Sequence, residues 1–175
     1  IMPPVVTGYL LLMLFGRTGV VGQVLSEYFG ITLAFRWTGA VLAAAIMAFP
    51  LVVRAVRLSI EQINPELEHV ALTLGARPLT VLLTVTIPMA LPGILVGAVL
   101  GFAKALGEFG ATITFVGNIP NQTQTVPSAI YGFLQMPGKE QGAFTLVFIS
   151  VCISITALLL SEWLARRVQK RVHGQ

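Results

Sequence analysis

"NPELEHVALTLGARPLTVLLTVTIPMALPGILVGAVLGFA", residues 64–103, joins a short charged segment to a long uncharged one. The uncharged part, Leu79–Ala103, has twenty-five residues. As an α-helix it measures about 37 Å, against a hydrocarbon core of about 30 Å, so it is long enough to cross a bilayer. The charged part, residues 64–78, is too polar to do so. The question is therefore why a polar helix directly precedes a membrane span.

The composition of the whole chain is that of a membrane protein. Of its 175 residues, 55% are hydrophobic and only 10% are charged, whereas a soluble domain usually carries about 25% charged residues. The net charge of +4 is small and scattered. This argues against a nucleic-acid partner and suits cationic loops beside a cytoplasmic leaflet. The sequence predicts an all-α, polytopic helical protein in a lipid bilayer.

Uncharged stretches predict several spans within one transmembrane domain, residues 1–175. The spans cover about residues 1–15, 38–57, 79–103 and 143–163. The first is short and its apolar stretch is already under way at residue 1, so we expect the end of a span in an N-terminally incomplete sequence. Residues 104–142 are rich in glycine, proline and amides. We expect an irregular segment there on the periplasmic side, with a re-entrant or short extra span as an open alternative.

The distribution of basic residues predicts the orientation of these spans, because cytoplasmic loops carry an excess of Lys and Arg. With the C-terminal tail in the cytoplasm, seven such residues lie inside: Arg54, Arg57, Arg77, Arg166, Arg167, Lys170 and Arg171. Four lie outside: Arg17, Arg36, Lys104 and Lys139. The opposite orientation reverses this bias, so we expect a cytoplasmic C-terminus.

The polar segment has the end signals of one short helix over residues 65–75. Asn64 is a favourable N-cap, Pro65 suits the first helical position, and Gly75 can adopt the left-handed conformation just after the end. An apolar stripe runs along one face of this helix through Leu67, Val70, Ala71 and Leu74.

This helix has two possible interpretations. It is either a connector that lies on the membrane surface or a projecting helix that docks into another protein. Membrane-surface helices are usually rich in Lys and Arg. Glu66 and Glu68 would instead be repelled by anionic lipid, which favours a protein partner. We expect Glu68, His69 and Thr73 to face away from the apolar stripe.

Small residues recur every four positions in the third predicted span, at Gly93, Gly97 and Gly101. This spacing lets helix backbones approach closely in lipid. It serves packing within the chain or, alternatively, a subunit interface or the lining of a pathway. Pro88 and Pro92 predict a kink in the same span.

Lys104 and Glu108 stand four residues apart, a spacing that allows an ion pair on a helix. Charges near a membrane are costly and often functional, so both residues are candidates for a gate, a structural pair or direct contact with an anion. Thr112 and Thr114 follow in the same segment as further pathway or gate candidates.

Several kinds of site are missing from the sequence. It has no GxxxxGK[ST] motif for nucleotide phosphates, no aspartate, and only two histidines, His69 and His173. We therefore assign no catalytic residue, no metal and no cofactor to this chain.

Residues 68–88 resemble the cytoplasmic "EAA" signature of inner-membrane permeases in binding-protein-dependent ABC importers. That signature places glycine and proline thirteen positions apart, as Gly75 and Pro88 are here. Ala71 matches its second alanine, but His69 replaces its glutamate and Glu68 stands one position early.

A second stretch narrows the resemblance. "KALGEFGATITFVGNIP", residues 104–120, is similar to permeases for tetrahedral oxyanions: molybdate, tungstate, sulfate and thiosulfate. "TQTVPSAIYGFLQ", residues 123–135, and "LLLSEWLARR", residues 158–167, resemble molybdate permease subunits in particular. The resemblance runs over essentially the whole chain.

The resemblance implies a type I importer permease of the MetI-like fold in a bacterial inner membrane, working as a homodimer. A periplasmic binding protein would deliver the anion, and separate cytoplasmic ATPase subunits would hold ATP and Mg. The ATPase-coupling residues it implies are Glu66, Glu68, His69, Ala71, Gly75 and Pro88. A sulfate or thiosulfate permease, a self-sufficient channel or secondary transporter, and a membrane anchor for an enzyme complex are the alternatives.

Overall fold

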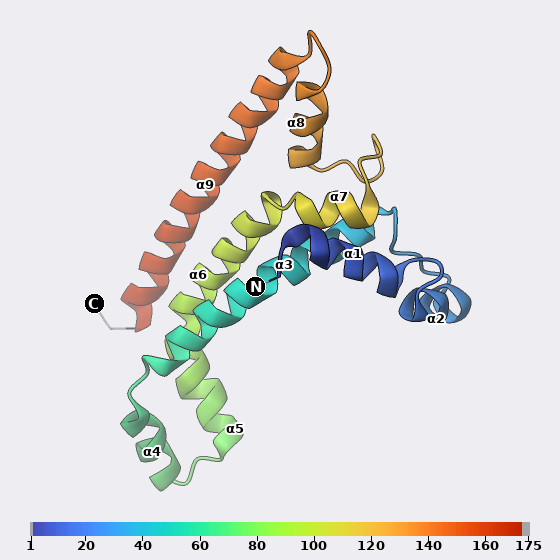
Figure 1. The fold of residues 1–175 in the computed structure, drawn as a ribbon. Coiled ribbons are helices and arrows are strands. Elements are labelled where there is room, and N and C mark those ends of the chain that lie inside the picture. The colour runs from blue at the N-terminus through green and yellow to red at the C-terminus, as the bar shows by residue number, and fades with distance from the viewer. Residues whose placement is uncertain (1, 173–175) are drawn as a thin grey trace. The chain divides into compact units, whose positions relative to one another are not determined.

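The computed structural model describes the backbone of residues 2–172, with the side chains of these residues except 161 and 164–172. The four basic residues of the predicted cytoplasmic tail thus lie outside the described side chains. All regular elements of the described part are helical (Figure 1), which confirms the predicted all-α class. They are α1 (Pro4–Phe15), α2 (Val20–Phe29), α3 (Trp37–Glu61), α4 (Pro65–Thr73), α5 (Pro78–Val81), the π-helical turn η1 (Leu82–Thr86), α6 (Ile87–Leu106), α7 (Gly110–Val116), α8 (Val126–Leu134) and α9 (Glu140–Val172).

Three helical stretches are long and apolar enough to cross a membrane: Trp37–Glu61, Pro78–Leu106 and Glu140–Leu160. Within their most apolar windows, only 17%, 17% and 6% of residues are buried. Their apolar side chains are therefore available to lipid or to other helices, as membrane spans require. Helices α1 and α2 are bent by 48° relative to each other and can together form one broken span. Helix α1 alone has 12 residues, about 18 Å, which is shorter than the hydrocarbon core of about 30 Å.

The chain divides into two compact units, described here one at a time. Within the described residues, the first contains 2–48 and 102–153, and the second contains 49–101 and 154–172. Helix α3 passes from the first to the second after Ala48, and α6 passes back after Gly101.

The core of the first unit forms where α1 packs on α7. Its fully buried members are Leu11, Ala43, Ala111, Phe115 and Val116. Glycines allow this approach: a side chain at Gly8 would overlap the Ala111 carbonyl, and one at Gly110 would press on Pro4. The rings of Phe15 and Phe115 complete the contact edge to face, with centroids 6.5 Å apart.

The segment 104–142, expected to be irregular, contains the two short helices α7 and α8. A capping box starts α8: the Thr125 hydroxyl accepts from the Ser128 amide, and the Ser128 hydroxyl accepts from the Thr125 amide. The side chain of Asn118 bonds to the Ser128 hydroxyl and carbonyl as well. The amides and hydroxyls that suggested irregular backbone therefore close a turn and satisfy a helix end.

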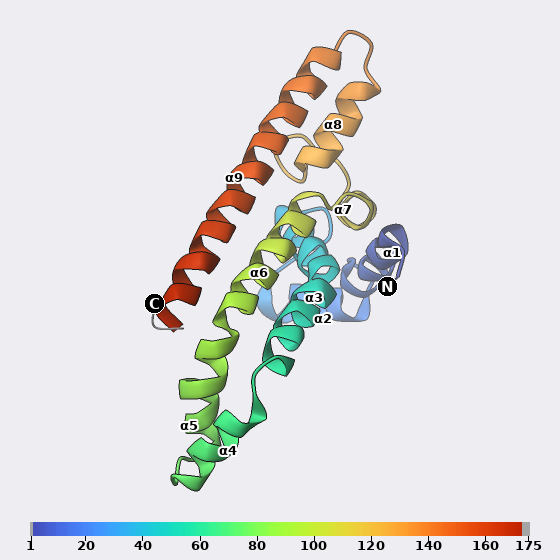
Figure 2. The same cartoon turned by 90° about the vertical axis from the view of Figure 1, so that its left-hand side faces the viewer.

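In the second unit, the glycines of α6 lie against α3 (Figure 2). A methyl group at Gly93 would overlap the Ser59 side chain, and one at Gly101 would overlap Val52. At Gly97 it would lie 3.1 Å from the Cβ of Ala55. The Ser59 hydroxyl donates to the carbonyl of Ala90 at 3.1 Å. The small-residue face thus serves packing within the chain here, one of the alternatives left open by the sequence.

The span Pro78–Leu106 changes its hydrogen-bond pattern near its N-terminal end, at η1. The amide of Ile87 donates to the carbonyl of Leu82, five residues back. Pro88 has no N–H, so it cannot donate to the carbonyl of Thr84, and its ring would crowd that carbonyl in a regular helix. The disturbance predicted from Pro88 and Pro92 takes the form of a π-turn immediately before Pro88, while α6 continues through Pro92.

Candidate functional site

Helix α4, in the second unit, is closed at both ends by local hydrogen bonds. Asn64 Oδ1 accepts from the backbone amide of Glu66 at 3.0 Å, and Pro65 occupies the first turn. At the other end Gly75 has a φ of 87°. The amide of Gly75 donates to the Leu72 carbonyl and that of Ala76 to the Ala71 carbonyl, which is the Schellman pattern. The backbone groups at both ends of α4 are thus satisfied locally, without any contact from its apolar face.

The apolar stripe of α4 points to the outside of the unit. Leu67, Val70 and Leu74 are 43%, 57% and 83% exposed, and Ala71 is half-buried at the edge of the stripe. The inner face is formed instead by Glu68 and Leu72. They line a cavity of about 360 Å³ together with Ile60, Pro78, Val81, Leu82 and Thr86. An exposed apolar stripe on a well-capped helix is a surface suited to a protein partner.

Glu68 connects α4 to the following membrane span. The hydroxyl of Thr86, which is only 5% exposed, donates to Glu68 Oε1 at 2.6 Å. Glu68 lies off the apolar stripe as the sequence suggested, but it faces the inside of the unit rather than solvent. His69 and Glu66 are exposed on the outside, where Glu66 Oε2 accepts from Asn64 Nδ2 at 3.4 Å.

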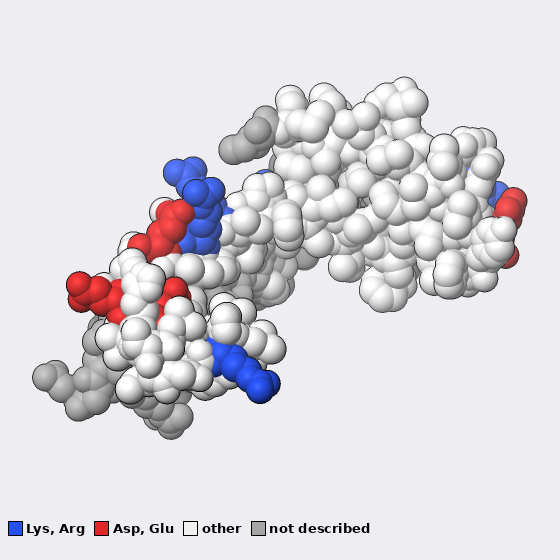
Figure 3. Space-filling view, turned by 90° about the horizontal axis from the view of Figure 1, so that it is seen from below, with Lys and Arg blue, Asp and Glu red and all other residues white. Residues whose placement is uncertain are grey.

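Charged side chains gather over the end of the second unit that carries α4 (Figure 3). Exposed residues of both signs occur in this part of the chain: Arg57, Glu61, Glu66 and Arg77. The guanidinium Nε of Arg57 contacts Glu61 Oε1 at 2.7 Å on the surface. This mixture of charges around an apolar stripe has the composition of a protein interface with a polar rim.

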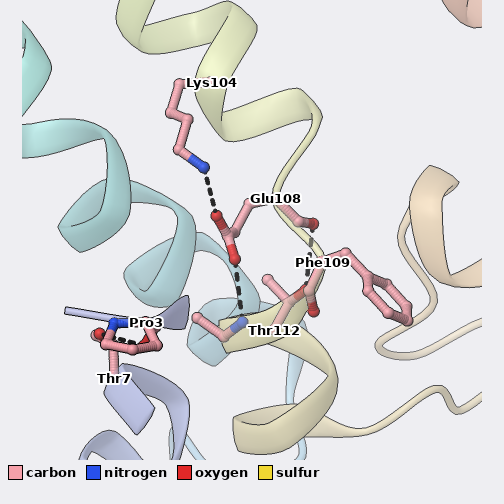
Figure 4. A network of polar contacts seen from close by, with 7 residues as sticks. Pro3, Thr7, Lys104, Glu108, Phe109 and Thr112 are labelled. Carbon is pink, nitrogen blue, oxygen red and sulfur yellow. Dashed lines mark hydrogen bonds and ion pairs between the residues drawn. The ribbon is translucent and has the colours of Figure 1, made fainter. Parts of the chain in front are cut away.

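The second group of candidates lies in the first unit, around Glu108 (Figure 4). Glu108 is 2% exposed and both of its oxygens are bonded. Oε2 contacts Lys104 Nζ at 3.0 Å, and Oε1 accepts from the backbone amide of Ala111 at 3.0 Å in the first turn of α7. The side chain of Lys104 is 41% exposed. Glu108 therefore caps α7 and pairs with Lys104, which is a structural arrangement.

The hydroxyls of Thr112 and Thr114 are used within α7. Thr112 donates to the carbonyl of Phe109 at 2.9 Å, and Thr114 donates to that of Gly110 at 2.8 Å. Since each hydroxyl has one hydrogen, neither has a donor left for an anion in this arrangement. The structure thus brings Lys104, Glu108 and Thr112 together. Both Glu108 oxygens and the Thr112 hydroxyl hydrogen are used in local bonds, whereas the partly exposed Lys104 ammonium keeps further N–H donors.

Two features of the structure could not be predicted from the sequence. One is the Glu68–Thr86 contact, which no local spacing indicates because the residues are 18 apart. The other is a cavity of about 560 Å³ at the α1–α2 bend, lined in part by Arg17, Arg36 and Phe35. Both arginines are exposed, so this cavity is an open surface feature, and it contains no predicted site residue.

Comparison with known proteins identifies the family. The family described as "Binding-protein-dependent transport system inner membrane component" matches residues 1–174. This chain belongs to that family. Together with its membrane-length helices, this makes it a multi-pass component of an inner membrane, and the predicted MetI-like permease fold is confirmed.

Individual relatives align over nearly the whole chain. The molybdenum transport system permease protein ModB of Escherichia coli K12 is 57% identical over 171 residues, covering 98% of this chain and 75% of the relative. ModB of Haemophilus influenzae is 54% identical over 172 residues, with the same coverage. A putative molybdenum transport system permease protein, YvgM of Bacillus subtilis, is 37% identical over 173 residues, covering 99% of this chain and 73% of the relative.

Proposed function

We propose that this chain is the permease subunit of an ATP-driven ABC importer that carries molybdate across the inner membrane. The observation that carries this proposal is the 57% identity to a molybdenum transport permease over 98% of the chain. Molybdenum is dissolved in water as the tetrahedral molybdate dianion, so a permease for this element must pass an oxyanion. Membership in a binding-protein-dependent family argues against a self-sufficient channel and against a membrane anchor.

In this proposal ATP hydrolysis belongs to a separate ATPase subunit, which holds ATP and Mg, and α4 is its docking site. The exposed apolar stripe of Leu67, Val70 and Leu74 supports this role. Two copies of the chain form a homodimer around the pathway, a periplasmic binding protein delivers molybdate, and the C-terminus lies in the cytoplasm. The bias of Lys and Arg supports this orientation, with seven on the cytoplasmic side and four on the other.

Mechanically, α4 is suited to pass movement from the ATPase to the spans. It is a short rigid unit, capped at both ends, between α3 and the span Pro78–Leu106. Movement of the ATPases during ATP binding and hydrolysis displaces α4. Because the loops on both sides of α4 are only a few residues long, the displacement reaches both spans.

The test is uptake by the complete complex. The permease, its ATPase and the binding protein are reconstituted in liposomes with ATP inside, and labelled molybdate is added outside. We expect ATP-dependent accumulation against the gradient that requires all three components. Accumulation by the permease alone would contradict the proposal. Competition separates the anions: preferential uptake of sulfate over molybdate would show that the substrate has been assigned wrongly.

A further inference from the structure

The hydrogen bond between Glu68 and Thr86 is a long-range contact in a helix whose other polar contacts are local. The side chains of Asn64 and Thr73 bond within α4 and its cap. Glu68, by contrast, reaches a residue 18 positions later in the next membrane span, at 2.6 Å. A hydrogen bond to a carboxylate is stronger than one between neutral groups, and partial burial limits competition from water.

Thr86 occupies a special place in that span, as the last residue of the π-turn η1. The hydroxyl of Thr84, in the same turn, donates to the carbonyl of Thr80 in its own helix at 2.7 Å. The hydroxyl of Thr86 is directed to Glu68 instead. The two threonines of this turn thus bond to different partners, and only the buried Thr86 bonds to α4.

The π-turn interrupts the α-helical hydrogen-bond ladder of this span. Its bonds span five residues rather than four, and Pro88 removes a further donor immediately after it. Such turns interrupt α-helices mostly at functional positions, and they are places where a helix can change its local geometry. A force applied at Thr86 therefore acts where the regular α-helical bonding of the span is interrupted.

The rest of the contact between α4 and the span is apolar. Besides Glu68 and Thr86, the cavity between them is lined by Ile60, Leu72, Val81 and Leu82 with Pro78. Apolar contacts are not directional and allow α4 to slide. The hydrogen bond fixes a direction and a position, so it can transmit a displacement that the apolar contacts would not.

We propose that Glu68 and Thr86 are positioning residues of the transport cycle. Their hydrogen bond transmits the displacement of α4 to the π-turn, and the π-turn is the point at which the span flexes. This inference rests on the proposed function, because it requires an ATPase that moves α4. It gives Glu68 a role through Thr86 rather than through contact with the ATPase, whose docking stripe lies on the opposite face of α4.

The experiment compares Thr86→Val with Thr86→Ser in the complete reconstituted complex. Valine keeps the shape of threonine but has no hydroxyl, whereas serine keeps the hydroxyl. We expect Thr86→Val to recruit the ATPase within twofold of wild type. Molybdate uptake and the stimulation of hydrolysis by loaded binding protein should fall about tenfold, the effect of one lost charge-assisted hydrogen bond. Thr86→Ser should keep at least half of both.

A second pair of variants keeps the test independent of any folding defect in Thr86→Val. Glu68→Gln preserves an acceptor for the hydroxyl without the charge and should give an intermediate loss of uptake. In the double variant Glu68→Ala/Thr86→Val, the loss of uptake should equal the loss in Glu68→Ala alone or in Thr86→Val alone. It should not equal the product of the two losses, because each change removes the same hydrogen bond. Thermal unfolding of each purified variant reports its stability.

Three results would overturn the inference. They are uptake by Thr86→Val within twofold of wild type, multiplicative losses in the double variant, and loss of ATPase recruitment together with uptake. The last would mean that the bond only holds α4 in shape. A wild-type complex without molybdate uptake is a different outcome, since it refutes the proposed function itself and the inference with it.

Discussion

Glu68 and Glu108 are both withdrawn from solvent and both bond to a neighbouring helical element, yet the two sites differ in range. Glu108 bonds only to groups three and four residues away, at Ala111 and Lys104. Glu68 bonds to Thr86, 18 residues away in another element. The first carboxylate closes a local turn and holds α7 in place, and the second joins α4 to a different element, η1.

Burial alone therefore does not identify a residue that would couple movement to transport. Glu108 is the more buried of the two, at 2% exposure, but its bonds are completed within its own segment. Breaking them should affect stability first. Breaking the Glu68–Thr86 bond should affect coupling first. The following variants test this division.

The largest expected effect is on stability, from Glu108→Ala. This change removes the acceptor of the buried Ala111 amide and leaves a void beside α7, which packs on α1 in the core of the first unit. Loss of a cap together with an unsatisfied amide should cost about 2–4 kcal/mol. Thermal unfolding of the purified permease in detergent measures it, and we expect a Tm several degrees lower.

The matched control is Glu108→Gln, whose amide oxygen can still accept from Ala111. Its Tm should lie closer to wild type than that of Glu108→Ala. Equal destabilisation by both variants would mean that the charge, rather than the cap, holds this region together.

Gly75→Val is expected to disturb the end of α4. Gly75 has a φ of 87°, and no atom lies within 4 Å of an added Cβ, so the cost is in the backbone alone. A β-branched residue in this conformation costs on the order of 1–2 kcal/mol. Stimulation of the ATPase by loaded binding protein should fall severalfold, while insertion into the membrane is unchanged.

Gly75→Asn is the control, because asparagine tolerates the left-handed conformation better than valine. It should retain most of the stimulation. If Gly75→Val supports normal recruitment and normal stimulation, α4 is only a connector between spans.

Leu74→Ser tests the outer face of α4 without touching Glu68. Leu74 is 83% exposed, so the Tm of the isolated permease should stay the same. Binding of the ATPase should weaken at least about tenfold if the residue is buried on docking, because burial of a leucine contributes about 1.5–3 kcal/mol. Co-purification over a series of ATPase concentrations measures this. Unchanged binding would remove the apolar stripe from the docking surface.

How far the sequence could predict these sites is shown by α4. Its ends could be predicted, because Asn64, Pro65 and Gly75 act locally. Its periodicity predicted which residues form the apolar stripe, but periodicity cannot tell whether that stripe faces the core or a partner. In α4 the stripe is exposed and the polar Glu68 faces inward. The contact with Thr86 depends on how the loop folds back, which no local pattern encodes.

The span Pro78–Leu106 is a second case in which local sequence patterns predict a feature but not its form. Its length followed from an uncharged run, and Pro88 and Pro92 predicted a disturbance. The form of the disturbance, a π-turn before Pro88 and continuous helix through Pro92, did not follow. A missing donor can be accommodated by a kink or by a wider turn, and the sequence around Pro88 does not distinguish the two.

The smallest effect is expected from Lys104→Gln, which distinguishes a structural pair from direct contact with the anion. The Lys104 side chain is 41% exposed, and Glu108 keeps its bond to Ala111 without it. Although Glu108 is buried, glutamine at position 104 keeps an N–H donor for its carboxylate, so the Tm should fall less than in Glu108→Ala. If Lys104 only pairs with Glu108, the KM for molybdate uptake at saturating binding protein should stay within twofold of wild type. If its ammonium meets the dianion during passage, the uptake rate should fall strongly while the Tm stays nearly constant, because a lost charge contact in the pathway is not compensated by Glu108. The arrangement favours the first result, since Glu108 Oε2 lies 3.0 Å from the ammonium of Lys104 and offsets its charge.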